Sequence, residues 1–63
     1  MKNKIKELRI RDGLTLEYLS FRSNVSVSYL SLLEHGKRKK PSISVMDKIA
    51  HALEKPVSDV FFD

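Results

Sequence analysis

Four consecutive basic residues form the most concentrated charge in the chain: Lys37, Arg38, Lys39 and Lys40. Ammonium and guanidinium groups bind phosphate, and a cluster of them releases the counterions condensed on a polyanion. Residues 1–40 contain ten Lys or Arg against four Asp or Glu, whereas residues 41–63 contain two against four. The charge therefore indicates a polyanionic partner for the N-terminal part; the alternative is a polar loop charged only for solubility.

The segment before this basic run has the spacing of two short helices joined by a tight turn. One helix is expected after Thr15, ending near residue 22 or 23, and the other from Ser26 to residue 34 or 35. Asn24 lies where the chain must reverse, and Asn tolerates the left-handed conformation well. The positions expected to face inward are Leu16, Leu19 and Ser20 in the first helix and Leu30, Leu33 and Glu34 in the second. This pattern is typical of a helix-turn-helix, a DNA-binding unit.

The outward side of the second helix supplies the candidate base contacts. A helical wheel places Ser28, Ser31 and Leu32 outward, with Val27 at the margin and Ser26 at the cap. Short hydroxyls read bases weakly, and an apolar side chain can contact a thymine methyl group, so we expect modest discrimination that favours A·T-rich sites. The candidate contacts to the DNA backbone are Thr15, Tyr29, Lys37, Arg38, Lys39 and Lys40.

The remaining pattern predicts a single all-α domain over residues 1–63, a five-helix bundle. The first helix is expected from about residue 3 to residue 12, ended by Gly13, and Gly36 is expected to end the third. A fourth helix carries an apolar stripe of Ile43, Met46, Ile49, Ala50 and Leu53, and a short fifth follows Pro56. No segment alternates with period two for long enough to predict a strand.

These segments resemble the Cro/C1-type (Xre family) helix-turn-helix domains, including lambdoid phage repressors and SinR-like regulators. The resemblance rests on IKELRIRDGLT, LSFRSNVSVSYLSLLEHGKRKKPS and KIAHALEKPVSDVF, and so covers nearly the whole chain. It implies a lambda-repressor-like five-helix bundle that inserts its third helix into the major groove, usually as a dimer on a palindromic site. The chain departs from the family where Leu16 replaces a frequent Gln and where Val27 and Leu32 replace long polar residues.

Apolar residues near the C-terminus suggest a surface for a second copy of the chain. Phe61 and Phe62 are adjacent and cannot easily both enter one small core, and Ile10 and Phe21 also fall on outer faces. A contiguous exposed apolar group marks a contact surface. Since lambdoid-type domains dimerise near this part of the bundle, we expect a homodimer interface formed by Val57, Phe61 and Phe62; the alternative is that Phe62 folds over the first helix.

Arg9 and Glu34 are charged residues on the inward faces of their helices. Arg9 shares a face with Ile5 and Leu8, and Glu34 shares one with Leu30 and Leu33. Each buried charge needs a partner of opposite sign. We therefore predict an ion pair between Arg9 and Glu34, as similar phage repressors show at matching positions.

Other classes of function find little support in the sequence. The chain has no cysteine, and its two histidines, His35 and His51, lie on different predicted helices, so neither a disulfide framework nor a metal site is expected. No nucleophile has a convincing base nearby, which argues against an enzyme, and no cofactor or small molecule is indicated. The frequent charges near the start argue against a signal peptide or membrane span, and together with the missing cysteine they favour the cytoplasm. The resemblance implies that this is the cytoplasm of a bacterium.

The prediction is therefore a sequence-specific DNA-binding transcriptional regulator, a small repressor or autoregulator that acts as a homodimer on a palindromic operator and is encoded by a bacterium or phage. The alternative is an antirepressor or protein-interaction module that uses the same fold to bind another regulator. The missing long polar readers favour the alternative, and the basic run opposes it.

Overall fold

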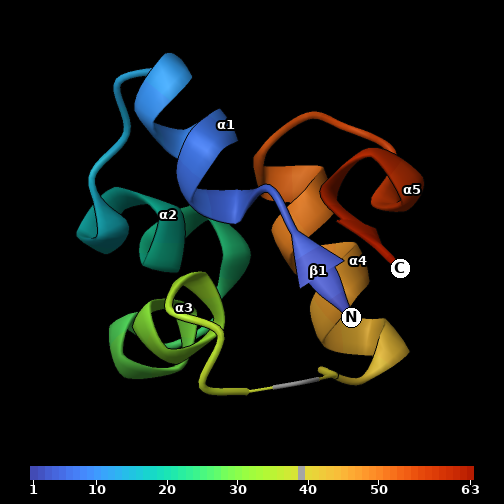
Figure 1. The fold of residues 1–63 in the computed structure, drawn as a ribbon. Helices are drawn as coiled ribbons and strands as arrows, with labels where there is room; N and C mark the ends of the chain where they lie inside the picture. Colours follow the sequence, from blue (N-terminus) through green and yellow to red (C-terminus); the bar gives the residue numbers. More distant parts are fainter. Residues whose placement is uncertain (39) are drawn as a thin grey trace.

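The computed structural model describes residues 1–38 and 40–63, and within them the chain forms five helices and two very short strands (Figure 1). Lys39 lies outside the described residues, so its expected phosphate contact is not placed. The elements are β1 (Lys2–Asn3), α1 (Ile5–Arg11), α2 (Leu16–Ser23), α3 (Val27–Glu34), α4 (Ile43–Ala52), α5 (Val57–Val60) and β2 (Phe61–Phe62). The predicted all-α bundle is confirmed, with one small strand pair added to it.

Side-chain caps begin three of the helices at the residues that precede them. The hydroxyl oxygens of Thr15, Ser26 and Ser42 accept hydrogen bonds from backbone N–H groups three residues later, at 3.0, 3.1 and 3.2 Å. Each bond satisfies one of the N–H groups that a helix start leaves without an intrahelical partner. The predicted starts of α2 and α3 are thereby confirmed.

Left-handed residues follow four of the helices. Gly13 and Gly36, which were predicted to end α1 and α3, follow these helices and adopt φ +70°, and Asn24 ends α2 at φ 59°. Glu54 adopts φ 57° after α4, and the backbone N–H of Lys55 bonds to the carbonyl of Ala50 at 3.0 Å. Equivalent bonds end two other helices: the N–H of Leu14 donates to the carbonyl of Arg9 in α1, and the N–H of Lys37 donates to the carbonyl of Leu32 in α3. Glu54 stores strain in the left-handed conformation, because its side chain, unlike that of glycine or asparagine, is not readily accommodated there.

The strand pair corrects two expectations about the chain ends. The first helix starts at Ile5, not near residue 3, and β1 pairs with β2 in antiparallel register, with Lys2 opposite Phe62 and Asn3 opposite Phe61. Strands of two residues are too short to show an alternating pattern. They form because the bundle brings the two ends of the chain side by side, as Figure 1 shows.

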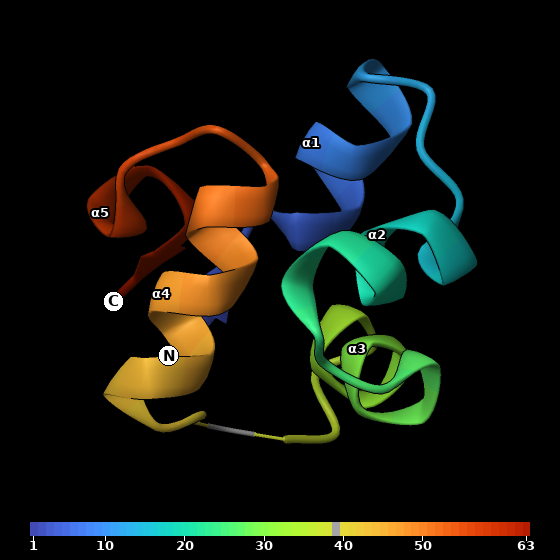
Figure 2. The same ribbon diagram turned by 180° about the vertical axis from the view of Figure 1, so that it is seen from behind.

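The core is a single apolar cluster drawn from every helix. α2 packs on both α3 and α4, and Figure 2 shows α2 and α4 next to each other from behind. Ile43 was expected in the apolar stripe of α4, but it is 74% exposed because it occupies the first position of the helix, beyond the reach of the core. The buried members are Ile5, Leu8, Leu19, Val25, Leu30, Leu33, Met46, Ile49, Ala50, Ala52, Leu53, Val60 and Phe61.

Candidate nucleic-acid interface

The turn between α2 and α3 is held by local hydrogen bonds and one buried side chain. The N–H of Asn24 donates to the carbonyl of Ser20 at 2.8 Å, and Val25 is buried beneath the turn. Ser23 is also buried, and its hydroxyl oxygen accepts from the N–H of Val25 at 3.2 Å. The role of Ser23 was not predicted from the sequence. The feature that could have indicated it is a small hydroxyl residue directly before the reversal at Asn24. The turn therefore fixes the angle between α2 and α3.

The outer face of α3 carries the predicted base-contacting residues together. Ser28 and Leu32 are exposed, and Leu32 retains 38% of its accessible surface; Val27 and Ser31 are half-buried. Leu30 and Leu33 lie on the opposite side and are buried in the core. α3 thus presents short hydroxyls and apolar groups to its outside and no charged side chain.

Two predicted contact residues already use their hydroxyl oxygens to cap helices. Ser26 and Thr15 are exposed, and each accepts a hydrogen bond from a backbone N–H. A hydroxyl that accepts such a bond can still donate its own hydrogen to a phosphate or base. Their caps therefore leave each residue one donor to offer to a ligand.

The loop after α3 carries exposed positive charge beside the helix. Lys37, Arg38 and Lys40 are all exposed. The guanidinium of Arg38 lies 5.7 Å from the centre of the Tyr29 ring, within the range of a cation–π contact. Because Tyr29 lies within α3, this contact holds Arg38 beside the helix and groups two predicted phosphate ligands.

The C-terminal end of α3 is fixed by the predicted ion pair. Arg9 donates to both carboxylate oxygens of Glu34, from Nε at 2.7 Å and from Nη2 at 3.1 Å, and its Nη1 donates to the carbonyl of Leu14 at 2.8 Å. The side chain of Glu34 is 2% exposed and that of Arg9 is 14% exposed. The hydrogen bond to Glu34 raises the pKa of Arg9, against an opposing effect of burial. The pair thus ties α3 to α1.

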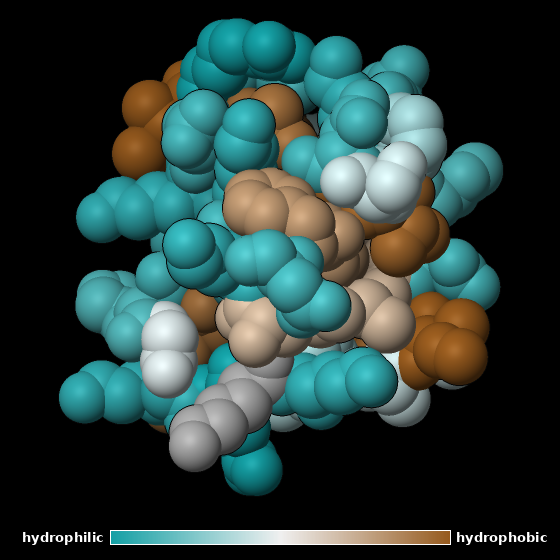
Figure 3. All heavy atoms as spheres, turned by 45° about the vertical axis from the view of Figure 1, so that its right-hand side comes forward, coloured by the Kyte–Doolittle hydropathy of each residue, from teal (hydrophilic) through white to brown (hydrophobic). Residues whose placement is uncertain are grey.

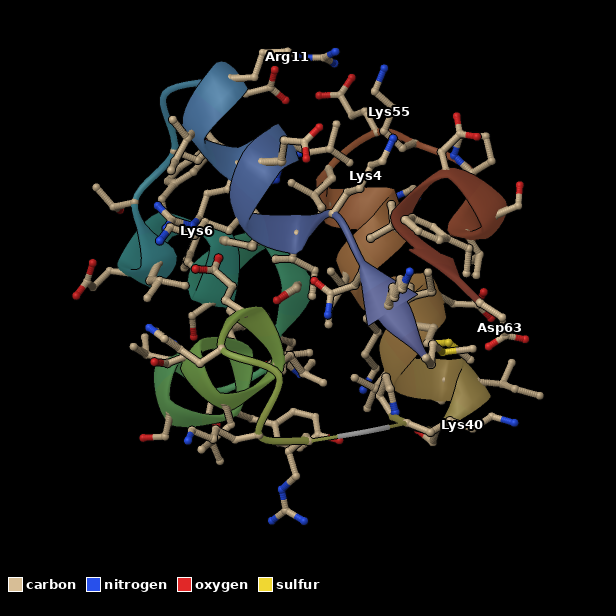
Figure 4. The ribbon with its side chains drawn as sticks, in the orientation of Figure 1. Lys4, Lys6, Arg11, Lys40, Lys55 and Asp63 are labelled. Atoms are coloured by element: carbon tan, nitrogen blue, oxygen red, sulfur yellow. The ribbon has the colours of Figure 1, made fainter. Side chains whose placement is uncertain are left out.

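Basic residues also lie far from this loop. Figure 4 shows Arg11 and Lys55 at the end of the molecule opposite Lys40. On the outer side of α2, Arg22 lies 3.4 Å from the hydroxyl of Tyr18, a hydrogen bond that raises the pKa of Arg22. The basic residues of the chain are therefore divided between two ends of the fold, and only some of them flank α3.

The predicted dimer residues do not share one environment. Phe61 was expected in the dimer interface, but it is 5% exposed and packs inside the protein's own core, so it is not available to a partner. Val57 and Phe62 are half-buried, with the ammonium of Lys4 at 5.7 Å from the Phe62 ring centre. The two phenylalanines separate because neighbouring residues of a strand point to opposite faces. Figure 3 shows apolar atoms gathered on the side of the molecule that carries β1, α4 and α5.

Two further classes of site find no support in the described part of the chain. Residues 1–38 and 40–63 contain no group of three or more His, Asp or Glu placed to hold a metal ion. None of the helices described is long and apolar enough to cross a membrane.

Comparisons with known proteins agree with this geometry. Residues 5–60 match the helix-turn-helix family. The chain is 35% identical over 57 residues to the HTH-type transcriptional regulator SlrR of Bacillus subtilis, and 39% identical over 59 residues to the transcriptional regulator ClgR of Mycobacterium tuberculosis. These matches cover 90% and 94% of this chain but only 38% and 52% of the relatives. The chain thus spans about half the length, or less, of these two relatives.

Two solved structures have similar folds. The restriction-modification controller protein C.AhdI from Aeromonas hydrophila superposes with a TM-score of 0.85 at 34% identity, over 92% of this chain and 86% of that one. The clp gene regulator ClgR from C. glutamicum gives a TM-score of 0.77 at 36% identity, over 87% of this chain and 70% of that one. All of these relatives are named as regulators or controllers, and none as an enzyme.

Proposed function

The chain belongs to the helix-turn-helix family, and from this membership we propose that it binds double-stranded DNA as a sequence-specific transcriptional regulator. The observation that carries the proposal is the outer face of α3, which is accessible along its length and lies next to exposed cations of the following loop. A helix of this kind fits the major groove, and the adjoining cations then reach the phosphates on its edge.

Base reading falls to the residues on the outer face of α3. The hydroxyls of Ser26, Ser28 and Ser31 can each make a single hydrogen bond, which discriminates less than a bidentate Arg or Gln contact. Leu32 and Val27 offer apolar contact to thymine methyl groups. We therefore expect a binding site rich in A·T pairs in which each base pair contributes modestly.

Affinity comes mainly from the DNA backbone in this proposal. Thr15 caps the start of α2, Tyr29 lies within α3, and Lys37, Arg38 and Lys40 follow α3. Each phosphate that a cation neutralises makes binding more sensitive to salt. The cation–π contact of Arg38 with Tyr29 supports a concerted role, because it places the guanidinium beside the helix before DNA arrives.

A homodimer on a palindromic operator is the assembly we propose. Val57 of α5 and Phe62 of β2 are half-buried and so keep accessible surface for a partner. A twofold pair would engage two half-sites one helical turn apart, about 34 to 36 Å. Occupation of a promoter by such a dimer would repress transcription in the cytoplasm of a bacterium, whether the chain is encoded by the bacterium or by a phage.

Selection of DNA from a random-sequence pool tests the function directly. The wild-type chain should enrich a palindromic, A·T-rich sequence and should bind it more tightly than random DNA in gel-shift titrations at two salt concentrations. Binding that is equal for selected and random DNA would remove sequence specificity from the proposal. Failure to bind either DNA at low salt would contradict the proposal itself.

A protein-interaction module, such as an antirepressor, is the second candidate, and one observation favours it. Phe21 is 81% exposed on the outer face of α2, and Ile10 and Tyr18 are exposed as well. This candidate predicts that selection yields no preferred DNA and that Phe21→Ser abolishes a complex with a second regulator. Under the DNA-binding proposal, the same variant should bind DNA as the wild type does.

A further inference from the structure

Asn3 lies where the two ends of the chain meet the first helix. It is the last residue of β1 and lies opposite Phe61 of β2 in the strand pair. The next residue, Lys4, donates its backbone N–H to the carbonyl of Val60 at 2.9 Å, and α1 then begins at Ile5. The backbone of Asn3 is therefore held against the C-terminal segment.

The side-chain amide of Asn3 makes one hydrogen bond at each end. Its oxygen accepts from the N–H of Ile5 at 3.1 Å, and its nitrogen donates to the carbonyl of Leu33 at 3.1 Å, 30 residues away in sequence. The Leu33 carbonyl is one of the last four of α3, which have no partner one turn further on. It also accepts from the N–H of Gly36 at 3.1 Å. Asn3 thus supplies its second donor from outside the helix.

Two side chains from the start of the chain consequently hold the last turn of α3. Arg9 binds Glu34 from α1, and Asn3 binds Leu33 from β1. Among the side-chain hydrogen bonds of residues 1–38 and 40–63, only that of Asn3 joins the strand pair to α3. Both contacts are partly buried and involve neither Ser28 nor Leu32, the exposed residues of α3, so they can fix the helix without occupying the groups offered to a ligand.

We propose that Asn3 is a positioning residue for DNA binding, which sets the place of α3 relative to the β1–β2 pair and the apolar side beside it. The inference rests on the proposed function. In a dimer joined through that apolar side, the position of α3 within each subunit determines the separation of the two recognition helices. Since half-sites repeat with the helical turn of DNA, a shifted α3 cannot engage both of them equally well.

Asn3→Asp removes one of the two hydrogen bonds of the Asn3 side chain and keeps the other. A carboxylate can still accept the hydrogen bond from Ile5 and suits the start of a helix, but it cannot donate to the Leu33 carbonyl and places one oxygen against another. Ala52→Gly is the control, because it lowers stability through the helix propensity of α4 and lies outside β1, β2 and α3. Ala52 is buried in the core, so the variant changes no exposed side chain of the apolar side. Both variants are compared with the wild type at a temperature where all three are folded.

The experiment measures gel-shift affinity for the palindrome selected by the wild type, for a single half-site, and for palindromes with one base pair added or removed between the half-sites. Asn3→Asp should lose about tenfold in affinity for the palindrome and keep single half-site affinity within about twofold, because only simultaneous engagement is lost. Its preference for the original spacing should weaken as well. Ala52→Gly should match the wild type in all three measurements.

Hydrogen exchange at the backbone amides of Gly36 and Lys37 gives a readout that needs no DNA. Exchange should be faster in Asn3→Asp than in Ala52→Gly, because the last turn of α3 opens more readily. The inference is overturned if Asn3→Asp behaves as Ala52→Gly does, in exchange or in spacing preference, while the wild type binds the palindrome. If the wild type selects no DNA, the proposed function has failed first, and the role of Asn3 in DNA binding is withdrawn with it.

Discussion

Replacement of Arg9 tests whether the buried ion pair is essential to the fold. Arg9→Met keeps much of the apolar stem of the side chain but removes the guanidinium, which makes two hydrogen bonds to Glu34 and one to the Leu14 carbonyl. The side chain of Glu34 is 2% exposed, so its carboxylate would then be left buried with no partner of opposite charge. The variant therefore isolates the cost of an unpaired buried charge.

The expected loss follows from the burial of the two partners. Breaking a fully buried pair by removing one member costs about 3 to 5 kcal/mol. Arg9 is 14% exposed, so water can approach Glu34 once the guanidinium is gone, and we expect a value near the lower end, about 3 kcal/mol. A domain of 63 residues has a total stability of about 3 to 9 kcal/mol, so Arg9→Met should remove about a third or more of it.

Urea denaturation of the single and double variants measures this loss. Arg9→Met should lower the midpoint strongly, and Arg9→Met combined with Glu34→Leu should recover most of the stability, because a packed apolar pair of similar volume replaces the ions. A loss below about 1 kcal/mol for Arg9→Met would refute the reasoning, since that is the value of a solvent-exposed pair.

The alkaline side of the stability curve adds a check on the same pair. The pKa of Arg9 is raised in the folded state by its hydrogen bond to Glu34. A raised pKa adds stability that is complete below the unfolded-state pKa and is lost only as the pH rises through the folded-state pKa. The guanidinium should therefore contribute equally from neutral pH to about pH 10.

Four other variants test the phosphate contacts, the base contact of Leu32, the dimer and the strain at Glu54. Lys37→Ala with Lys40→Ala should weaken binding to selected and random DNA alike and reduce the slope of log affinity against log salt by about 0.9 per lost phosphate contact, with sequence preference unchanged. Leu32→Ser should leave that slope intact and reduce preference for thymine by about 1 kcal/mol in a base-substitution series. Phe62→Asp should sediment as a folded monomer with much weaker operator binding; a wild type that is itself monomeric on DNA would contradict this. Glu54→Gly should raise the urea midpoint by relieving the left-handed strain, about 1 kcal/mol, and an unchanged midpoint would show that the strain is absent.

The sequence by itself determined the local features of the helix-turn-helix. The caps at Thr15 and Ser26, the reversal at Asn24 and the helix end at Gly36 could all be predicted, because each depends on the conformation of a few neighbouring residues. The pairing of Arg9 with Glu34 could also be predicted, since two charges on inward faces must compensate each other.

Periodicity located the apolar faces less completely. It placed Ile43 in the stripe of α4, but the helix starts there and the side chain lies beyond its neighbours. Periodicity also did not predict that Phe61 is buried while Phe62 is only half-buried. The two residues form the short strand β2, in which neighbouring side chains point to opposite faces. Whether these side chains are buried or exposed depends on the residue at which each element begins, and packing determines that residue.

Tertiary structure alone decided how the distant parts of the chain meet. The β1–β2 pair joins residues that are 58 and 60 positions apart, and the bond from Asn3 to Leu33 joins residues 30 positions apart. Neither contact leaves a local pattern in the sequence. Residues 1–40 carry the basic excess of the sequence, but the fold places Arg11 at the end of the molecule opposite Lys40 of the basic loop. Local propensity acts over a few residues, whereas contacts between distant segments exist only after the core has brought those segments together.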